Sequence, residues 1–315
     1  MAQTSPLTPA EAGVQRPGLL GPRFRGDERV RRVDDAVESP ARRALRRLWR
    51  RKGAVVGLVV VALFVAIAIF APLISPYDPA AQSWTAVRKA PSWAHWFGTD
   101  DVGRDVLARV IFGARASLLA GVISVSIALA VGVPLGLISG YLGGWVDALL
   151  SRITDAMLAV PFLILAIALA AFLGPSLGNA MIAIGVTTTP IFVRLTRGQV
   201  MAVKVEDYVE AARAIGNPRW RIAFFHILPN ILPALLVQAT LSIAAAIIAE
   251  AALSFLGLGQ QPPAPSWGSM LNSAQRFLTT ASWMAIWPGL AIFLTVLSFN
   301  LVGDGLRDAL DPKER

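Results

Sequence analysis

One carboxyl group stands in the middle of an otherwise apolar stretch. Glu250 is the ionisable residue that lies well inside the run 242–257, whose other members are mostly Ala, Ile and Leu. A carboxylate at that depth in a membrane is costly unless it is paired, protonated or in contact with water. Two interpretations are open. The first, which we favour, is a structural hydrogen bond to a neighbouring helix; the second is direct handling of substrate or protons on a transport pathway.

Three consecutive hydroxyl groups precede a proline in another apolar stretch. Thr187, Thr188 and Thr189 come directly before Pro190. Threonine hydroxyls can bond the backbone carbonyls of a helix interrupted by proline, so helix repair is one interpretation. The other interpretation is that these hydroxyls line a pathway for a polar substrate.

The residues needed for most other kinds of chemistry are missing. The chain has no cysteine, and its two histidines, His95 and His226, have no carboxylate at metal-ligand spacing. The phosphate-binding pattern G-x-x-x-x-G-K-[ST] does not occur. Asp100, Asp101 and Asp105 lie close together, but the bidentate glutamate of a calcium loop is lacking. We therefore expect no catalytic residue, metal or cofactor in this chain, so it is not expected to be an enzyme.

The polar segment 203–229 interrupts the apolar sequence. Apolar residues of its first half recur at helical spacing, namely Val205, Tyr208, Val209, Ala212 and Ile215. Gly216 is the expected helix stop, because glycine enters the left-handed C-terminal conformation without steric cost. Asn217 and Pro218 are interpreted as the N-cap and first residue of a second short helix, which should end near Pro229.

Two short amphipathic helices joined at a glycine bend form a knob suited to a groove on another protein. Ala211 and Ala212 carry small side chains, which would allow such a partner to approach closely. An ordinary amphipathic loop without a partner is the alternative that the segment alone leaves open.

The composition places the chain in a membrane. Of its 315 residues, 55% are hydrophobic and only 16% are charged. Six apolar runs are candidates to cross a bilayer, at about 54–74, 117–141, 153–173, 179–193, 233–257 and 283–302. We therefore expect an all-α polytopic membrane protein with about six transmembrane helices. Within these runs Pro161 predicts a kink, and Gly132, Gly136 and Gly140 predict close helix packing.

The remaining regions follow from these runs. We expect residues 1–52 to form a disordered basic cytoplasmic tail and juxtamembrane segment, 53–75 the first transmembrane helix, and 76–116 an extracytoplasmic segment. In that segment Thr99 or Asp100 is expected to cap a helix that runs through Val106 and Ile111. Residues 117–305 are expected to form the transmembrane core, and 306–315 a cytoplasmic C-terminus. The proline-rich stretch 257–282 is expected to have no regular structure.

The basic residues indicate the orientation. Residues 1–52 hold 13 Lys or Arg against 6 Asp or Glu. With both termini inside the cell, most other basic residues also fall inside, and the segment 203–229 lies on the cytoplasmic side. Because no aromatic-interleaved basic patch occurs, the positive charge predicts contact with anionic lipid and not with nucleic acid.

The segment 203–229 resembles the EAA loop of binding-protein-dependent ABC importer permeases. The matching residues are Glu210, Ala211, Ala212, Gly216, Leu228 and Pro229, and Arg219 and His226 are further candidate coupling residues of the same loop. His226 replaces the isoleucine of the general pattern, in the form HILPN that is similar to the dipeptide, oligopeptide and nickel branch. The runs GTDDVGRD, LSFLGLG and FNLVGDGLRDALDP also resemble this branch, so the likeness covers roughly residue 45 to the end.

That resemblance implies a type I ABC importer permease fold and a set of partners. The expected partners are a homologous permease subunit in a heterodimer, two ATP-binding subunits that hold ATP and magnesium, and an extracytoplasmic substrate-binding protein. The loop would act as the coupling helix that docks on an ATPase, in a prokaryotic plasma membrane. The resemblance favours di- or oligopeptides over nickel or an oligosaccharide as substrate. A proton-coupled secondary transporter using Glu250, and a membrane scaffold without transport, are the alternatives from other functional classes.

Overall fold

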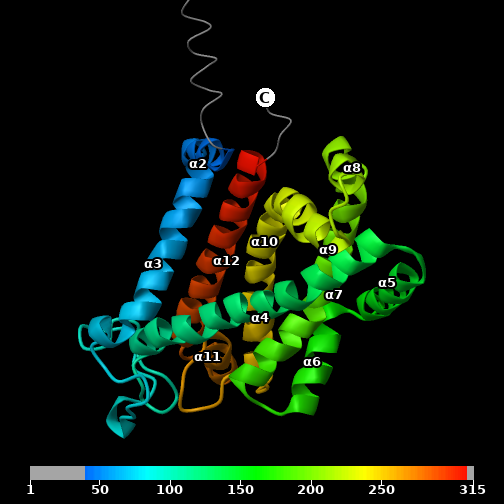
Figure 1. Cartoon of the computed structure of the whole chain (residues 1–315). Coiled ribbons are helices and arrows are strands. Elements are labelled where there is room, and N and C mark those ends of the chain that lie inside the picture. Colours follow the sequence, from blue (N-terminus) through cyan, green and yellow to red (C-terminus); the bar gives the residue numbers. More distant parts are fainter. Residues whose placement is uncertain (1–39, 311–315) are drawn as a thin grey trace, which may run out of the picture. The chain divides into compact units, whose positions relative to one another are not determined.

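The computed structural model of the chain describes residues 40–310, whose regular structure is helical apart from one bridge between Thr99 and Asp105 (Figure 1). The expected disordered tail before residue 40, and the end of the C-terminus at 311–315, lie outside the described residues. The chain divides into two units, Met1–Arg43 and Ala44–Arg315, and the second contains almost all of the described residues.

The helices follow in the order α2 (Pro40–Arg50), α3 (Lys52–Ile74), α4 (Val106–Leu142), α5 (Gly144–Ala159), α6 (Phe162–Leu173), α7 (Leu177–Val203), α8 (Asp207–Ala214), α9 (Arg219–Arg221), α10 (Leu228–Phe255), α11 (Trp267–Ala274) and α12 (Trp283–Leu310). A π-helical turn, η2 (Ile222–Ile227), joins α9 to α10, and short 3-10 turns occur at η1 (Trp84–Ala86) and η3 (Gln275–Phe277). In Figure 1, α3, α12 and α10 lie side by side and α4 crosses them at a steep angle.

Four helices among residues 40–310 are long and apolar enough to cross a membrane: α3, α4, the continuous helix Arg219–Phe255, and α12. The bent pair of α5 and α6 raises the number to five if it counts as one span. The sixth expected run lies in α7, whose 27 residues are sufficient in length but less apolar. Arg194 and Arg197 near its end, and the buried threonines within it, account for the lower hydropathy.

The expected kink at Pro161 is confirmed and is large. The axes of α5 and α6 make an angle of 93°, and Val160 and Pro161 between them have extended backbone conformations. Proline disfavours the helical conformation in the residue before it, which explains why the chain breaks at this point.

The expected close packing at the glycines of α4 is also confirmed. Gly132, Gly136 and Gly140 face α7, where an added Cβ would come within 3.0 Å of atoms of Phe192, Thr196 or Val200. The two helices therefore approach backbone to backbone, which a larger side chain would prevent.

Two expectations for the end of the molecule opposite α8 are wrong. The N-cap of α4 is Asp105, whose carboxylate accepts a hydrogen bond from the Ala108 amide at 2.7 Å, whereas Thr99 and Asp100 lie in the turn before it. The stretch 257–282 contains α11 and η3. A reciprocal capping box between Ser266 and Ser269 starts α11, and such a box needs no apolar periodicity.

Candidate functional site

The polar segment 203–229 forms a compact loop at one end of the second unit (Figure 1). Helix α8 has acidic residues in its first turn and Arg213 in its last, which complements the helix dipole. It ends in a Schellman motif: Gly216 has φ +81°, its amide bonds the Arg213 carbonyl, and the Asn217 amide bonds the Ala212 carbonyl. Gly216 is thus the predicted helix stop.

Asn217 does not cap the second helix as expected. Its side-chain amide donates back to the Ala212 carbonyl at 3.1 Å, and the N-cap of the next helix is Pro218. The Ala212 carbonyl near the end of α8 therefore accepts hydrogen bonds from both the backbone amide and the side-chain amide of Asn217.

The second helix does not end at Pro229 either. It continues through η2 into α10, so that Arg219–Phe255 is one helix of 37 residues. Proline cannot donate a backbone hydrogen bond, and the wider π turn adapts to this: the Leu228 amide bonds the carbonyl of Ala223, five residues earlier. Such π turns inside α-helices are frequent at functional sites.

The apolar residues of the loop divide into a buried and an exposed set. Val209 and Ala212 pack into the hydrophobic core against Ile222 and Ile227. Val205, Ile215 and Trp220 remain uncovered, with Ile215 80% and Trp220 61% exposed. The loop therefore carries an apolar surface beside a group of charged residues.

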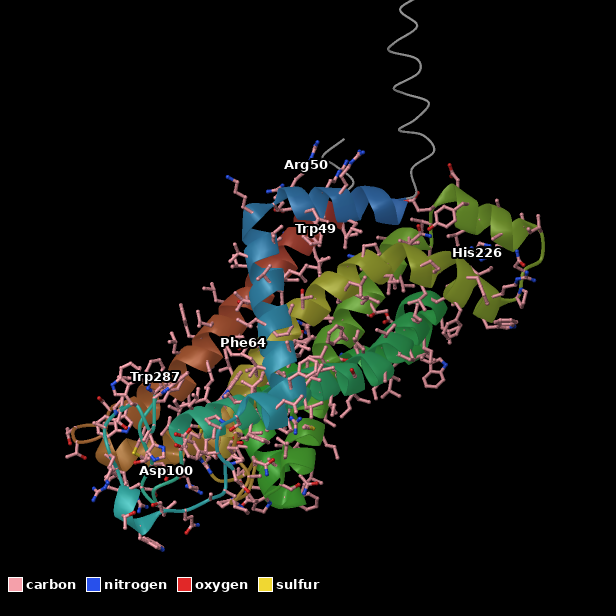
Figure 2. The ribbon with its side chains drawn as sticks, turned by 90° about the vertical axis from the view of Figure 1, so that its left-hand side faces the viewer. Trp49, Arg50, Phe64, Asp100, His226 and Trp287 are labelled. Atoms are coloured by element: carbon pink, nitrogen blue, oxygen red, sulfur yellow. The ribbon has the colours of Figure 1, made fainter. Side chains whose placement is uncertain are left out.

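The candidate coupling residues of the loop occupy different environments. Exposed positions are Glu210, Ala211, Gly216, Arg219 and Pro229. Ala212 is buried, so its small side chain serves packing within this chain and does not face a partner. His226 and Leu228 are half-buried, and His226 Nδ1 lies 3.4 Å from the Arg221 carbonyl oxygen. In Figure 2, His226 lies toward the same end as Trp49 and Arg50, away from Asp100 and Trp287.

Two further features belong to this loop. Burial, together with the neighbouring Glu206 carboxylate, raises the pKa of the Tyr208 hydroxyl, which therefore stays a neutral hydrogen-bonding group. A cavity of about 480 Å³ opens beside α8, and its polar lining includes Tyr141, Arg213 and Arg219.

Glu250 is fully buried where α10 meets α4. Its Oε2 accepts a hydrogen bond from Ser117 at 2.9 Å, and its Oε1 accepts one from Ser254 at 2.6 Å. Both carboxyl oxygens are therefore engaged within the chain, an arrangement that favours a structural role for Glu250.

The three threonines of α7 bond the carbonyls of the preceding turn. Thr187 donates to Ala183 and Ile184, Thr188 to Ile184, and Thr189 to Gly185, all at 2.7–2.9 Å. All three are buried. Their hydroxyl protons are thus used inside the helix, which does not favour the pathway interpretation. The carbonyl that Pro190 leaves without its amide partner is that of Val186, and none of these three hydroxyls bonds it.

A paired charge near the loop was not singled out from the sequence. The Asp147 carboxylate in α5 receives two hydrogen bonds from the Arg197 guanidinium in α7, at 2.5 and 2.8 Å, and one from Ser139. Fifty residues separate the two partners in the chain. No short motif could have predicted this pairing; only the fold brings them together.

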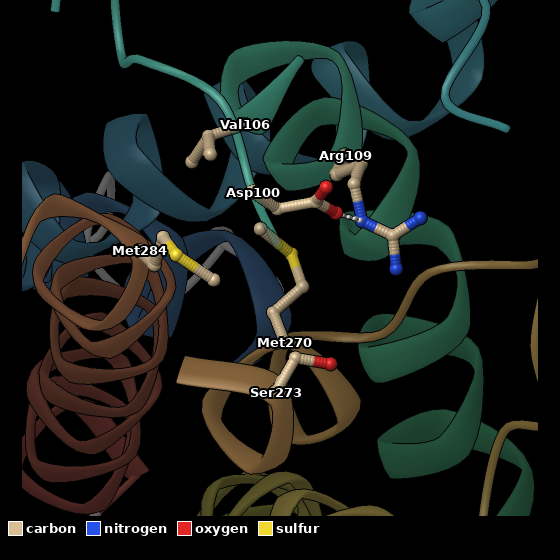
Figure 3. Close-up of a pocket in the computed structure, with 6 residues that line it drawn as sticks. All are labelled: Asp100, Val106, Arg109, Met270, Ser273 and Met284. Atoms are coloured by element: carbon tan, nitrogen blue, oxygen red, sulfur yellow. Dashed lines mark ion pairs between the residues drawn. The ribbon is translucent and has the colours of Figure 1, made fainter. Parts of the chain in front are cut away.

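At the opposite end, charged residues are held against each other around the start of α4 (Figure 3). Arg109 Nε lies 3.5 Å from Asp100, and its Nη1 donates to the carbonyls of Pro79 and Pro263. The cavity between them offers only about 10 Å³, at most room for one water molecule. His95 Nδ1 lies 2.8 Å from Asp105 Oδ2, a contact that the spacing of the two residues in the sequence does not predict.

Comparison with known proteins identifies the family. Residues 132–315 match the family described as binding-protein-dependent transport system inner membrane component, and residues 39–91 match the N-terminal TM domain of oligopeptide transport permease C. The dipeptide transport system permease protein DppC of Alkalihalophilus pseudofirmus is 51% identical over 275 residues, or 87% of this chain and 90% of that protein. The protein of the same name from Escherichia coli K12 is 53% identical over 270 residues, 84% and 90% of the two chains.

A solved structure supports the fold. A chain described under inward facing conformations of the MetNI methionine ABC transporter superposes with a TM-score of 0.55 at 20% identity, covering 65% of this chain and 97% of that chain. This likeness shows a shared helical fold. The chain therefore belongs to the binding-protein-dependent transport system inner membrane components, as a multi-pass ABC importer permease and not an enzyme.

Proposed function

We propose that this chain forms half of the translocation pore of an ATP-driven importer of di- or oligopeptides. The two relatives described above are named dipeptide transport permeases and are more than half identical in sequence to this chain, which supports peptides over nickel or an oligosaccharide. The other half of the pore would be a homologous permease subunit. An extracytoplasmic binding protein would deliver the peptide, and two ATP-binding subunits would hold ATP and magnesium.

The observation that carries the coupling role is the uncovered apolar surface of the loop 203–229. Ile215 and Trp220 project from a segment that also holds charged residues, so lipid is an unsuitable neighbour for the whole loop. A groove on an ATPase subunit would bury the apolar side chains, while Arg213 and Arg219 beside the polar cavity would pair with carboxylates of that partner.

The connections of the loop explain how a push on it would reach the pore. Val209 and Ala212 fasten α8 to η2, and η2 belongs to the continuous helix Arg219–Phe255. Lys204 also donates to the Gly140 carbonyl at the end of α4 at 2.8 Å. When ATP binding draws the two ATPase subunits together, movement of α8 would tilt these long helices and switch the pore between inward and outward openings.

The same proposal sets the orientation. The loop and both termini lie on the cytoplasmic side of the prokaryotic inner membrane, which agrees with the excess of basic residues in 1–52. The basic segment before α3 would rest on anionic lipid. A proton relay through Glu250 is less favoured, because serine hydroxyls engage both of its oxygens.

Cysteine cross-linking tests the docking. The chain has no cysteine, so Ile215→Cys introduces a single thiol at an exposed loop position. Leu278→Cys, exposed at the opposite end, is the matched control. A short bismaleimide should join the first variant to an ATPase subunit and leave the control unjoined. Equal yields for both, or a product of Ile215→Cys with the binding protein, would refute the docking site.

Transport assays test the function itself. In proteoliposomes, peptide uptake should require internal ATP and the binding protein, and should persist when the proton gradient is collapsed. Ala211→Glu, at an exposed position, should lower uptake more than ATP hydrolysis, because it disturbs the contact without entering the core. Uptake that follows the proton gradient alone would favour a secondary transporter, and no uptake at all would favour a scaffold.

A further inference from the structure

A cavity of about 580 Å³ lies between the end of α3 and the start of α4. Its floor is made by apolar residues of the two helices, and aromatic residues of the segment 75–105 form its rim. The residues that matter here are Ile74, Leu107, Ile111, Trp93, Trp96 and Asp105. This volume falls within the usual range for pockets that hold a small molecule, about 300–1,000 Å³.

The cavity lies beside the end of a candidate membrane span. Ile74 is the last residue of α3, and Leu107 lies in the first turn of α4, ten residues before the apolar run expected at 117–141. In Figure 1 this is the end opposite α8. The last turns of α3, a candidate membrane span, also expose Phe70, Leu73 and Ile74, so the cavity continues an exposed apolar surface of that span.

The rim residues suit the boundary between lipid and water. Trp93 is 96% and Trp96 is 66% exposed. Tryptophan side chains favour the level of the headgroups, where the ring contacts lipid and the N–H group reaches water. In water alone, two such exposed rings beside an apolar cavity would be unfavourable.

The interior of the cavity is suited to an apolar ligand. Its charged member, Asp105, already receives hydrogen bonds on both oxygens, from the Ala108 amide at 2.7 Å and from His95 Nδ1 at 2.8 Å. The remaining helix-borne walls are Ile and Leu side chains. Asp105 is therefore already paired within the chain, and most of the affinity for a guest would come from apolar contact with the Ile, Leu and Trp side chains.

We propose that this cavity binds an acyl chain of a phospholipid from the leaflet opposite the coupling loop, with Trp93 and Trp96 beside its glycerol region. Continuity with the lipid-facing end of α3 favours lipid over a docked protein segment. The bound lipid would fill the space between α3, α4 and the segment 75–105, and so hold that segment against the membrane.

A photoactivatable phospholipid with a diazirine in its acyl chain tests this proposal. The complete transporter is reconstituted with the probe, illuminated, and digested for mass spectrometry. We expect labelling of Leu107 and Ile111 inside the cavity, and of Leu73 on the outer surface of α3. Ala94→Trp places a large ring into the cavity and should lower labelling of the first two residues about tenfold, with Leu73 unchanged.

Ala90→Trp is the matched control, since Ala90 is exposed in the same segment but does not line the cavity. It should leave all labelling unchanged. If Ala94→Trp fails to assemble, Ile111→Trp fills the cavity from α4 and takes its place, and labelling of Leu107 relative to Leu73 is then the readout. Labelling of Leu107 at background level in the wild type, or unaffected by the filled cavity, overturns the proposal. A cross-link from Trp93→Cys to the binding protein or to another permease would likewise assign the cavity to a protein contact.

Discussion

Replacing Gly136 by alanine should push α4 and α7 apart. A Cβ atom added at Gly136 would lie 2.5 Å from Thr196 Cβ and 2.7 Å from the Val193 carbonyl oxygen. Neither atom is at the end of a flexible side chain, so a rotamer change cannot relieve the clash. Because carbon atoms in contact settle about 3.5–4.0 Å apart, the helices must separate by about 1 Å.

The expected cost follows from the length of the interface. Gly132 and Gly140, one turn to either side, show equally short approaches of 2.7 and 2.8 Å, so a local separation loosens the neighbouring contacts. A gap of about 0.5–1 Å forfeits a quarter to a half of the dispersion energy of each contact. Overpacking in close-packed interiors costs about 1–3 kcal/mol. We therefore expect Gly136→Ala to lower the free energy of unfolding by about 2 kcal/mol.

Gly198 provides the matched control. It lies in α7, and a Cβ at this position would meet nothing within 4 Å. Alanine favours helices over glycine by about 1 kcal/mol, so Gly198→Ala should leave stability unchanged or raise it by that amount. Unfolding of the purified protein in detergent, driven by sodium dodecyl sulfate and followed by circular dichroism, compares the variants. Equal stability of Gly136→Ala and Gly198→Ala would refute the argument from backbone approach.

Three further predictions use the same unfolding assay, and the first also uses the uptake assay. Glu250→Leu leaves two buried serine hydroxyls without their acceptor and should lower the free energy of unfolding by about 1–3 kcal/mol for each hydroxyl. Glu250→Gln should keep both assembly and uptake. Lost uptake with intact assembly in the Gln variant would instead place Glu250 on the pathway. Asp147→Asn weakens the doubly hydrogen-bonded pair with Arg197 and should lower the free energy of unfolding by about 1 kcal/mol. Asp155→Asn, whose pair with Arg194 is exposed, should leave that free energy unchanged. Equal losses in the two variants would contradict this ranking. Gly216→Ala should lower the free energy of unfolding by about 1 kcal/mol, because residue 216 has a positive φ and an added Cβ meets no other atom. Gly216→Asn should lower it by less. If the asparagine variant lost as much stability as the alanine variant or more, the cause would be a contact and not backbone strain.

The features that the sequence predicted well depend on one residue type and its immediate neighbours. Long apolar runs predict α3 and α12, Pro161 predicts the break before α6, and Gly216 predicts the end of α8. In each case the reason is local, because hydropathy, a missing backbone N–H group and the freedom of glycine act within a few residues. The family pattern in 203–229 is also local, because it consists of particular residue types at fixed spacing.

The features that the sequence did not predict depend on contacts between residues that only the folded chain brings together. Ala211 and Ala212 are identical in type, yet only Ala212 packs against η2. The Asn217 side-chain amide could bond forward or backward along the chain, and in the folded loop it bonds back to the Ala212 carbonyl near the end of α8. Helical periodicity likewise predicted an apolar face on α8 but not that Ile215 would stay uncovered.

The most distant partners were the least predictable. Asp147 and its arginine, and Glu250 and Ser117, are joined by packing between helices that are far apart in sequence. The cavity beside Trp93 exists only because the segment 75–105 folds back over the ends of two spans. The sequence by itself determined that this chain is a bundle of membrane helices with a bent polar loop. Three-dimensional packing determined which side chains remain free to act, because burial and pairing depend on neighbours that no local pattern encodes.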